Sequence, residues 1–303
     1  MKPPARQPQG FGPVAPAARA RWRARAGWVL TFFVLACLGL PGLTCAADRL
    51  LSFHNDGVGK ASDEMARFHQ EMLEDNPSEL WEARGEQLWR TAAGPLKADL
   101  TGCDLGLGAG VVPGAFARLP RWFADARQVM DLEQRLVWCM TQQQGLTRAE
   151  AEQDHFGNGP QRSRLEALSA WIAGQSKGLP MQAGIGHPEE QRLLALGERM
   201  FRYRAGSHDF ACATCHSGDH RRVRLQEVPN LTDPADARQA WTSWPAYRIS
   251  QGELRTMQYR LADCLRQQRL PEAVYGSELI TALSMYLAHQ AEGGIVTAPG
   301  LKR

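Results

Sequence analysis

The sequence predicts a mainly α-helical protein built from two copies of one unit in tandem. The first observation is an internal repeat, in which Leu119-Pro-Arg-Trp122 followed by Arg135-Leu-Val-Trp-Cys139 aligns with Trp244-Pro-Ala-Tyr247 followed by Arg260-Leu-Ala-Asp-Cys264. Each proline lies 19 residues before its cysteine. Such a recurrence in register favours a duplicated unit over one large core. The second observation is a set of stretches with helical periodicity.

Three of these stretches lie in the C-terminal half. Residues 188–203 carry apolar side chains on one side, residues 277–290 read as a closing helix, and residues 253–269 contain neither proline nor glycine. Gly197 suits a close crossing of the first two helices. Before them, residues 157–188 are rich in glycine and proline around a short apolar stretch, and we interpret them as an interdomain connection.

The N-terminal segment has the pattern of a secretory leader. Six basic residues precede an uncharged run from Trp28 to Leu40, and small residues follow at Thr44-Cys-Ala46. The run of 13 residues is too short for a comfortable bilayer span, so a retained membrane anchor is disfavoured. Acylation at Cys45 stays an alternative. The pattern predicts export to the periplasm with cleavage after Ala46.

Removing the leader's six basic residues takes the formal charge of the chain from +3 to about −3. The predicted mature protein is therefore mildly acidic. We expect no nucleic-acid partner, because binding to phosphate backbones needs a basic surface.

Cys212-Ala-Thr-Cys215-His216 is the attachment motif of a c-type haem. The two thiols would form thioethers with the porphyrin, and His216 would bind the iron. A zinc or redox C-x-x-C with a chance histidine is the competing interpretation, but zinc would require two further ligands at suitable spacing. The motif predicts one covalent haem c, because it occurs once in the sequence.

Five cysteines remain after leader removal, and the haem uses two of them. In the first copy the segment that matches the haem motif keeps Cys103 but lacks the second cysteine and the histidine. We interpret this copy as a class I cytochrome c-like domain that has lost its haem. Cys103 and Cys139 would both border the former haem pocket, which makes them the expected disulfide in an oxidising compartment. Two reduced, buried cysteines are the alternative.

These observations give an expected domain organisation. A signal peptide covers residues 1–46, the haem-less domain covers 47–156, the connection covers 157–188, and a class I cytochrome c-like domain with covalent haem covers 189–303.

Arg260 and Cys264 lie four residues apart and would share one face of the predicted helix. A guanidinium beside a sulfur favours the thiolate and offers a planar fork to an oxyanion. The plainer interpretation makes Arg260 a structural ion-pair partner and Cys264 a small buried hydrophobe. Recurrence of Arg-x-x-x-Cys in both copies favours a functional pair.

The chain resembles the SoxA subunits of the SoxAX cytochromes of the periplasmic sulfur-oxidising system. The resemblance covers most of the mature chain, through segments 103–106, 117–123, 131–139, 212–216, 244–248 and 259–264. It implies that His216 and Cys264 are the two axial ligands of the haem iron. It also implies that Cys264 can carry a persulfide and that Arg260 binds thiosulfate. Some relatives bear a second haem in the first domain, whereas this chain resembles the single-haem type.

The resemblance further implies the activity of an L-cysteine S-thiosulfotransferase. Thiosulfate would be joined oxidatively to a cysteine thiol of a SoxYZ-like carrier, with a SoxX-like cytochrome as heterodimer partner and site for the second electron. The main alternative is a plain electron-transfer cytochrome with His216 and a methionine, Met257 or Met285, on the iron. A peroxidase with two cytochrome domains is disfavoured, because it normally needs two haems and the sequence has one attachment motif.

Overall fold

The structure, a computed structural model, describes residues 76–153, 163–223 and 226–302, together with Glu64, Arg67, Phe68 and residues 70–72. The predicted signal peptide over 1–46 and its cleavage site lie outside these described residues. Among the described helices, none combines the length and the apolar character needed to cross a bilayer.

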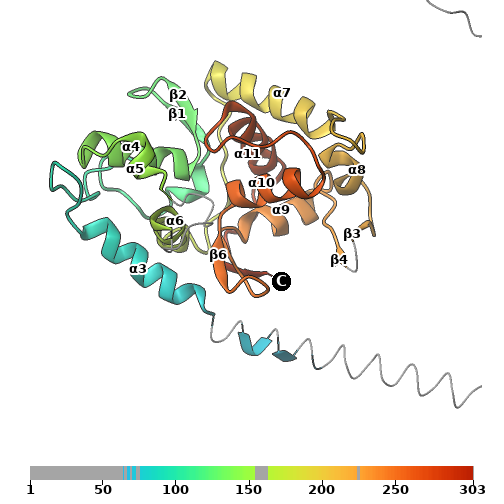
Figure 1. The fold of residues 1–303 in the computed structure, drawn as a ribbon, viewed down its shortest axis with the longest axis horizontal. Coiled ribbons are helices and arrows are strands. Elements are labelled where there is room, and N and C mark those ends of the chain that lie inside the picture. Colours follow the sequence, from blue (N-terminus) through green and yellow to red (C-terminus); the bar gives the residue numbers. More distant parts are fainter. Residues whose placement is uncertain are drawn as a thin grey trace, which may run out of the picture. The chain divides into compact units, whose positions relative to one another are not determined.

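The first half of the described chain alternates helices with one small hairpin (Figure 1). Its elements are α3 (Ser78–Arg90), the 3-10 turn η1 (Phe116–Arg118), β1 (Arg121–Phe123), β2 (Gln128–Met130), α4 (Leu132–Gln143), α5 (Arg148–Ala151) and α6 (Arg164–Gly174). Strands β1 and β2 pair antiparallel. A full capping box starts α4, because Asp131 accepts from the backbone of Gln134 while the Gln134 side chain accepts from the backbone of Asp131.

The second half also combines helices with small hairpins. Its elements are α7 (Pro188–Arg202), α8 (Cys212–His216), β3 (Arg222–Val223), β4 (Gln226–Glu227), α9 (Pro234–Thr242), β5 (Ala246–Arg248), β6 (Glu253–Arg255), α10 (Met257–Gln267), α11 (Glu278–Gln290) and β7 (Gly300–Lys302). Strand β5 pairs antiparallel with β6 and parallel with β7. The helices expected over 188–203 and 277–290 are confirmed, with ends within one residue of the expected ones.

The prediction of a helix over 253–269 is wrong for the first residues of this range. Residues Glu253–Arg255 form strand β6, which pairs with β5 across a tight turn. Gly252 makes this turn with φ of 67°, a left-handed conformation that glycine adopts without a steric penalty. Helix α10 begins only after Thr256, whose side chain accepts from the backbone N–H of Tyr259. A helix-compatible composition was therefore overridden by hairpin pairing.

Two helix pairs form the framework of the two halves. Helix α3 packs against α6, and α7 packs against α11 (Figure 1). In both pairs a glycine lies at the crossing: Gly85 meets the backbone of Ala167, and Gly197 meets the backbone of Ala282. An aromatic pair flanks each crossing, with ring centroids 5.6 Å apart for Trp89 and Trp171 and 5.1 Å apart for Phe201 and Tyr286.

Helix α6 lies within residues 157–188, which the sequence led us to interpret as a connection. Nine of its side chains are buried, and it forms the partner of α3 in the first half. Its apolar run is short and is flanked by glycine and proline, which is why composition alone pointed to a linker. The structure instead gives this stretch a role in the core.

Gly197→Ala is expected to destabilise the protein. A Cβ at this position would overlap the carbonyl oxygen of Ala282 and lie 2.8 Å from Cβ of Tyr286, so α7 and α11 would have to separate. We expect a loss of about 2 kcal/mol in the free energy of unfolding, and a fall of several degrees in Tm. Thermal unfolding followed by circular dichroism measures it. Gly184→Ala is the matched control, because a Cβ there would meet no atom within 4 Å. Equal Tm values for the two variants would refute the close crossing.

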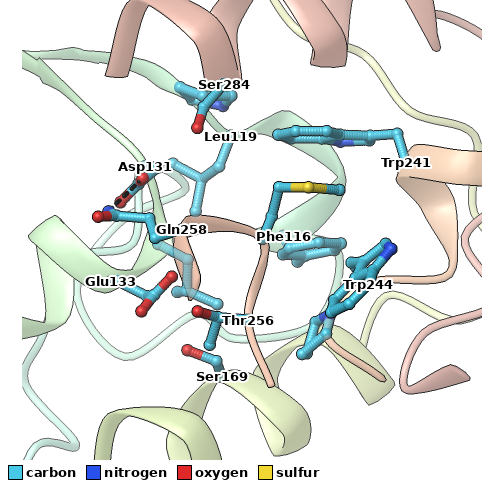
Figure 2. A pocket seen from close by; sticks show the side chains of 14 residues that line it. Phe116, Leu119, Asp131, Glu133, Ser169, Trp241, Trp244, Thr256, Gln258 and Ser284 are labelled. Atoms are coloured by element: carbon cyan, nitrogen blue, oxygen red, sulfur yellow. Dashed lines mark hydrogen bonds between the residues drawn. The ribbon is translucent and has the colours of Figure 1, made fainter. Parts of the chain in front are cut away.

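A buried polar cluster joins the two halves around a cavity of about 40 Å³, far too small for a porphyrin (Figure 2). Figure 2 shows Asp131 and Gln258 side by side, and the Gln258 amide donates to the Asp131 carboxylate at 2.6 Å. The Tyr275 hydroxyl donates to Glu133 at 3.2 Å. Because Gln258 lies in the first turn of α10, these bonds fix the start of the helix that carries Arg260 and Cys264.

Burial disfavours the charged form of these carboxyl groups. It raises the pKa of Asp131 to about 6, although hydrogen bonds from Gln134 and Gln258 act in the opposite direction. Burial, followed by the neighbouring Asp131, raises the pKa of Glu133 well above its usual range. Burial also raises the pKa of Glu166 to about 8, outweighing its ion pair with Arg255 at 3.0 Å.

The cluster predicts a stability that falls as pH rises. A carboxyl group whose pKa is higher in the folded than in the unfolded state stabilises fully below the unfolded value and loses this contribution as pH rises through the folded value. We therefore expect the contribution of these carboxyl groups to the free energy of unfolding to fall as the pH rises from about 4 to about 8. Glu133→Gln keeps the acceptor for Tyr275 but cannot ionise, so its denaturant-unfolding profile against pH is expected to be flatter. Glu198→Gln, on the exposed side of α7, is the control. A Glu133→Gln profile as steep as that of the unsubstituted protein would contradict this account.

Candidate functional site

The haem motif forms the short helix α8, directly after the loop that follows α7. The turn is stabilised by the Thr214 hydroxyl, which accepts from the backbone N–H of Ala211 at 2.9 Å. Helical spacing places Cys212 and Cys215 on one side, with His216 next to them. Both cysteines are free thiols and half-buried, so neither is committed to a disulfide in the described structure.

The orientation of His216 leaves one ring nitrogen available. Its Nδ1 lies 2.8 Å from the carbonyl oxygen of Pro229, which can only accept, so Nδ1 carries the proton. In the neutral imidazole Nε2 is then a bare lone pair, the arrangement usual for a metal-binding histidine. Burial lowers the pKa of His216 below its usual value; the hydrogen bond to Pro229 acts in the opposite direction, and the positive charge of Arg260 lowers the pKa further, so the neutral ring is favoured.

Helix α10 brings Arg260 and Cys264 to the same place as α8. The thiol of Cys264 is half-buried and free. Burial raises its pKa above the usual value; the Arg260 charge lowers it, and Cys215 and Asp263 raise it further. Arg260 therefore favours the thiolate as the sequence predicted, but burial outweighs it, and the isolated thiol stays protonated. Burial, followed by the proximity of Cys264, raises the pKa of Cys212 to about 12.

These mutual influences show that the structure brings the predicted residues together. Cys264 acts on both cysteines of the motif, and Arg260 acts on both Cys264 and His216. Half-buried apolar side chains at the edge of the core accompany them, among them Leu231 and Leu261. Three thiols, an imidazole and a guanidinium thus lie close together at the half-buried, apolar edge of the core.

Arg260 keeps most of its hydrogen-bonding capacity. Its Nη1 contacts the Asp263 carboxylate at 3.5 Å, whereas Arg266 and Gln267 each donate to that carboxylate at 2.7 Å. The Arg260 side chain is 32% exposed. Asp263 is therefore satisfied mainly by other donors, and Arg260 can present its fork to a ligand.

The first half provides an internal comparison for this pair. There Arg135 and Cys139 occupy the corresponding positions on α4. The structure joins Cys139 to Cys103 in a disulfide, the pairing that we expected, and both residues are in the core. Arg135 is 3% exposed, donates to the carbonyl of Asp104 at 2.6 Å and pairs with Asp125 at 2.9 Å. The same motif is thus wholly structural in the first half and open in the second.

Of the two methionines considered as alternative iron ligands, Met285 lies away from the haem motif. Met285 is fully buried against Val129, Leu193 and Ala282. Met257 lines the cavity at the joint between the halves. The burial of Met285 does not favour it as a ligand of a haem at α8.

The comparisons with known proteins agree with this geometry. The SoxA/TsdA cytochrome c domain family matches residues 84–181 and 196–296. The chain belongs to this family. A curated relative from Hydrogenophilus thermoluteolus, named L-cysteine S-thiosulfotransferase subunit SoxA, is 46% identical over 80% of this chain and 90% of its own length. A protein of the same name from Hydrogenobacter thermophilus is 29% identical over 74% of this chain and 83% of its own length.

A solved structure supports the fold of this SoxA/TsdA family member. The crystal structure of SoxXA from P. pantotrophus superposes with a TM-score of 0.63, covering 78% of this chain and 84% of that chain at 21% identity. The likeness extends over both halves of the described chain and supports a cytochrome c-type fold.

A cytochrome c domain implies a c-type haem, and the residues of this chain fit one. Cys212 and Cys215 are free thiols one helical turn apart, and the carbonyl of Pro229 orients the ring of His216. Sequence reasoning had found the cysteines and the histidine but not Pro229 or Asp263. Neither has a motif of its own, and Pro229 acts through its backbone carbonyl, which no sequence pattern reveals.

Proposed function

We propose that this chain, together with a SoxX-like cytochrome, couples thiosulfate oxidatively to a cysteine thiol of a SoxYZ-like carrier. The SoxA relatives carry the name of this thiosulfotransferase, and the first of them is 46% identical. The observation that carries the proposal is the open Arg260–Cys264 pair beside the haem motif. Its counterpart in the first half, Arg135 and Cys139, is closed.

The reaction joins two sulfur atoms and releases two electrons. A carrier thiol and thiosulfate form a bond between the thiol sulfur and the outer sulfur of thiosulfate, and one proton and two electrons leave. Arg260 would bind the sulfonate oxygens, because its planar fork matches an oxyanion. The sulfur at Cys264 would bond to the outer sulfur of thiosulfate in the step that releases the two electrons. Exchange with the carrier thiol would then move the whole –S–SO3− group to the carrier, and the carrier's proton would return to Cys264.

We assign the haem ligands from the same arrangement. Cys212 and Cys215 would hold one haem c covalently, and His216 and Cys264 would bind its iron. When bound, the haem supplies a one-electron acceptor and an iron that stabilises a thiolate. This would offset the burial that raises the pKa of Cys264. Because two electrons are released, the SoxX-like cytochrome is the expected site for the second.

We also propose that the two halves are copies of one cytochrome c-like unit, the first of which has lost its haem. The paired crossings at Gly85 and Gly197 support this, as do the hairpins that precede α4 and α10. The buried α6 supports extending the first domain to Gly174, so that the connection begins later than residue 157. The second domain then starts near residue 189.

We place the mature protein in the periplasm, after removal of the signal peptide over 1–46. Covalent attachment of haem to C-x-x-C-H and a disulfide between Cys103 and Cys139 both suit an exported protein. The carrier and the partner cytochrome would be met in the same compartment.

The proposal is tested with the chain co-expressed with a SoxX-like cytochrome and purified as a complex. Incubation with thiosulfate, a SoxYZ-like carrier and an electron acceptor is expected to add one thiosulfate to the carrier cysteine, detected by intact mass. The isolated chain is expected to be less active than the complex. A complex that reduces acceptors but leaves the carrier mass unchanged would identify an electron carrier instead.

A further inference from the structure

A second group of cations lies next to Arg260. Strand β5 ends at Arg248, which is in register with Lys302 of the parallel strand β7. Residues directly opposite in a sheet point to the same face, so two positive side chains stand next to each other there. Glu253 of β6 is in register with Arg248 on the other side of β5, but the described structure shows no ion pair between these two side chains.

The charges of this group act on one another and on the site. Burial lowers the pKa of Arg248; the adjacent Arg260 lowers it further, and Asp263 raises it. Burial and Arg248 lower the pKa of Lys302. Arg248, Lys302 and Arg260 thus form a connected cationic group, and Arg260 links it to Cys264. Asp263, the carboxylate that raises the pKa of Arg248, already accepts short bonds from Arg266 and Gln267.

One donor of this group has no partner. Nε of Arg248 is buried and makes no hydrogen bond within the described residues. A buried donor without an acceptor is costly, and like charges directly opposite in a sheet repel each other. An anion between the guanidinium groups would remove both penalties.

We propose that Arg248, supported by Lys302, is a second oxyanion-binding residue of the Cys264 site and makes it selective for a dianion. This rests on the proposed function, in which thiosulfate is the substrate. Thiosulfate has two negative charges and three sulfonate oxygens. The single positive charge of Arg260 balances only one of these charges. Two guanidinium groups hold the sulfonate end and leave the outer sulfur for Cys264. A monoanion of similar size gains less from the second cation.

Kinetics of the haem-loaded complex test the proposal. Arg248→Gln is expected to raise KM for thiosulfate about tenfold, with kcat changed less than KM, because a charge-assisted contact to the bound anion is lost. Arg248→Lys is expected to recover part of the loss, and Lys302→Gln is expected to have a smaller effect. Arg269→Gln is the matched control, since it removes one positive charge from an exposed position just beyond α10. An unchanged KM in Arg248→Gln would overturn the proposal.

Thermal unfolding separates anion binding from a structural role. At constant ionic strength, replacing chloride by thiosulfate is expected to raise Tm of the unsubstituted complex but not that of Arg248→Gln. In chloride, Arg248→Gln is expected to be at least as stable, because repulsion is relieved. A variant that is less stable in chloride but keeps the thiosulfate response would show that Arg248 is structural, and would overturn the proposal.

The haem carboxylates are the other anions that these cations could meet. If Arg248 served them, Arg248→Gln would shift the haem potential and leave KM for thiosulfate unchanged, which also overturns the proposal. Failure of the proposed function is distinguishable, because the unsubstituted complex would then not modify the carrier at all.

Discussion

Cys264→Ser is expected to abolish the coupling of thiosulfate to the carrier thiol while leaving covalent haem attachment intact. Serine has nearly the same size but cannot carry a sulfane sulfur, and its hydroxyl is a poor ligand for haem iron. The attachment cysteines lie on α8 and are not touched by the substitution. Intact mass of the purified chain checks the attachment, the visible spectrum checks the ligand change, and carrier mass checks the activity.

Met257→Leu is the matched control for this experiment. It lies on the same helix as Cys264 but lines the cavity between the halves. Its spectrum and coupling activity are expected to match those of the unsubstituted complex. If Met257→Leu alters the haem spectrum and Cys264→Ser does not, the iron has a methionine ligand and the site assignment is wrong.

Arg260→Ala is expected to weaken the use of thiosulfate by about tenfold to a hundredfold in kcat/KM. A charge-assisted hydrogen bond to an anion contributes about 1.5 to 3 kcal/mol, and each 1.4 kcal/mol is a factor of about ten. The low-spin haem is expected to persist, because Arg260 is not a ligand. Steady-state kinetics at varied thiosulfate, with the visible spectrum recorded for each variant, measure both effects.

Arg260→Lys is expected to restore only part of this loss, since lysine keeps the charge but lacks the planar fork. Arg269→Gln again controls for the net charge. The counter-result would be an Arg260→Ala variant with reduced stability and unchanged kcat/KM. That outcome would make the contact with Asp263 at 3.5 Å the function of Arg260.

Much of the site could be predicted because its residues lie in local patterns. The C-x-x-C-H run is contiguous, and Arg260 and Cys264 are one helical turn apart. The two helices that cross at Gly197, α7 and α11, have periodic apolar faces. Each also has a clear start, at the His187–Pro188 cap and at Ser277. Short-range spacing of this kind is sufficient to place α7 and α11 within a residue.

The parts that sequence reasoning missed depend on contacts between distant residues. Residues Glu253–Arg255 have a helix-compatible composition, and only their pairing with β5 makes them a strand. Helix α6 is recognised as core only through its contact with α3. The neighbours Arg248 and Lys302 are 54 residues apart in sequence and meet through a parallel strand pair. The sequence shows the charge of Arg248 but not which charged side chains lie next to it.

The net change in the pKa of Cys264 could not be predicted from the sequence either. The spacing of Arg260 predicts a favoured thiolate, and the direction of that one effect is right. Burial acts against it and is larger, and its extent depends on how α8 and α10 pack. The thiolate therefore needs a further stabilising partner, the role that we assign to the haem iron.

Electron paramagnetic resonance of the oxidised, haem-loaded chain tests the central claim most directly, because it reports the two axial ligands of the iron. The account predicts the low-spin signature of histidine–thiolate ligation, which disappears in Cys264→Ser and persists in Arg260→Ala. A histidine–methionine signature in the unsubstituted chain, unchanged in Cys264→Ser, would contradict it.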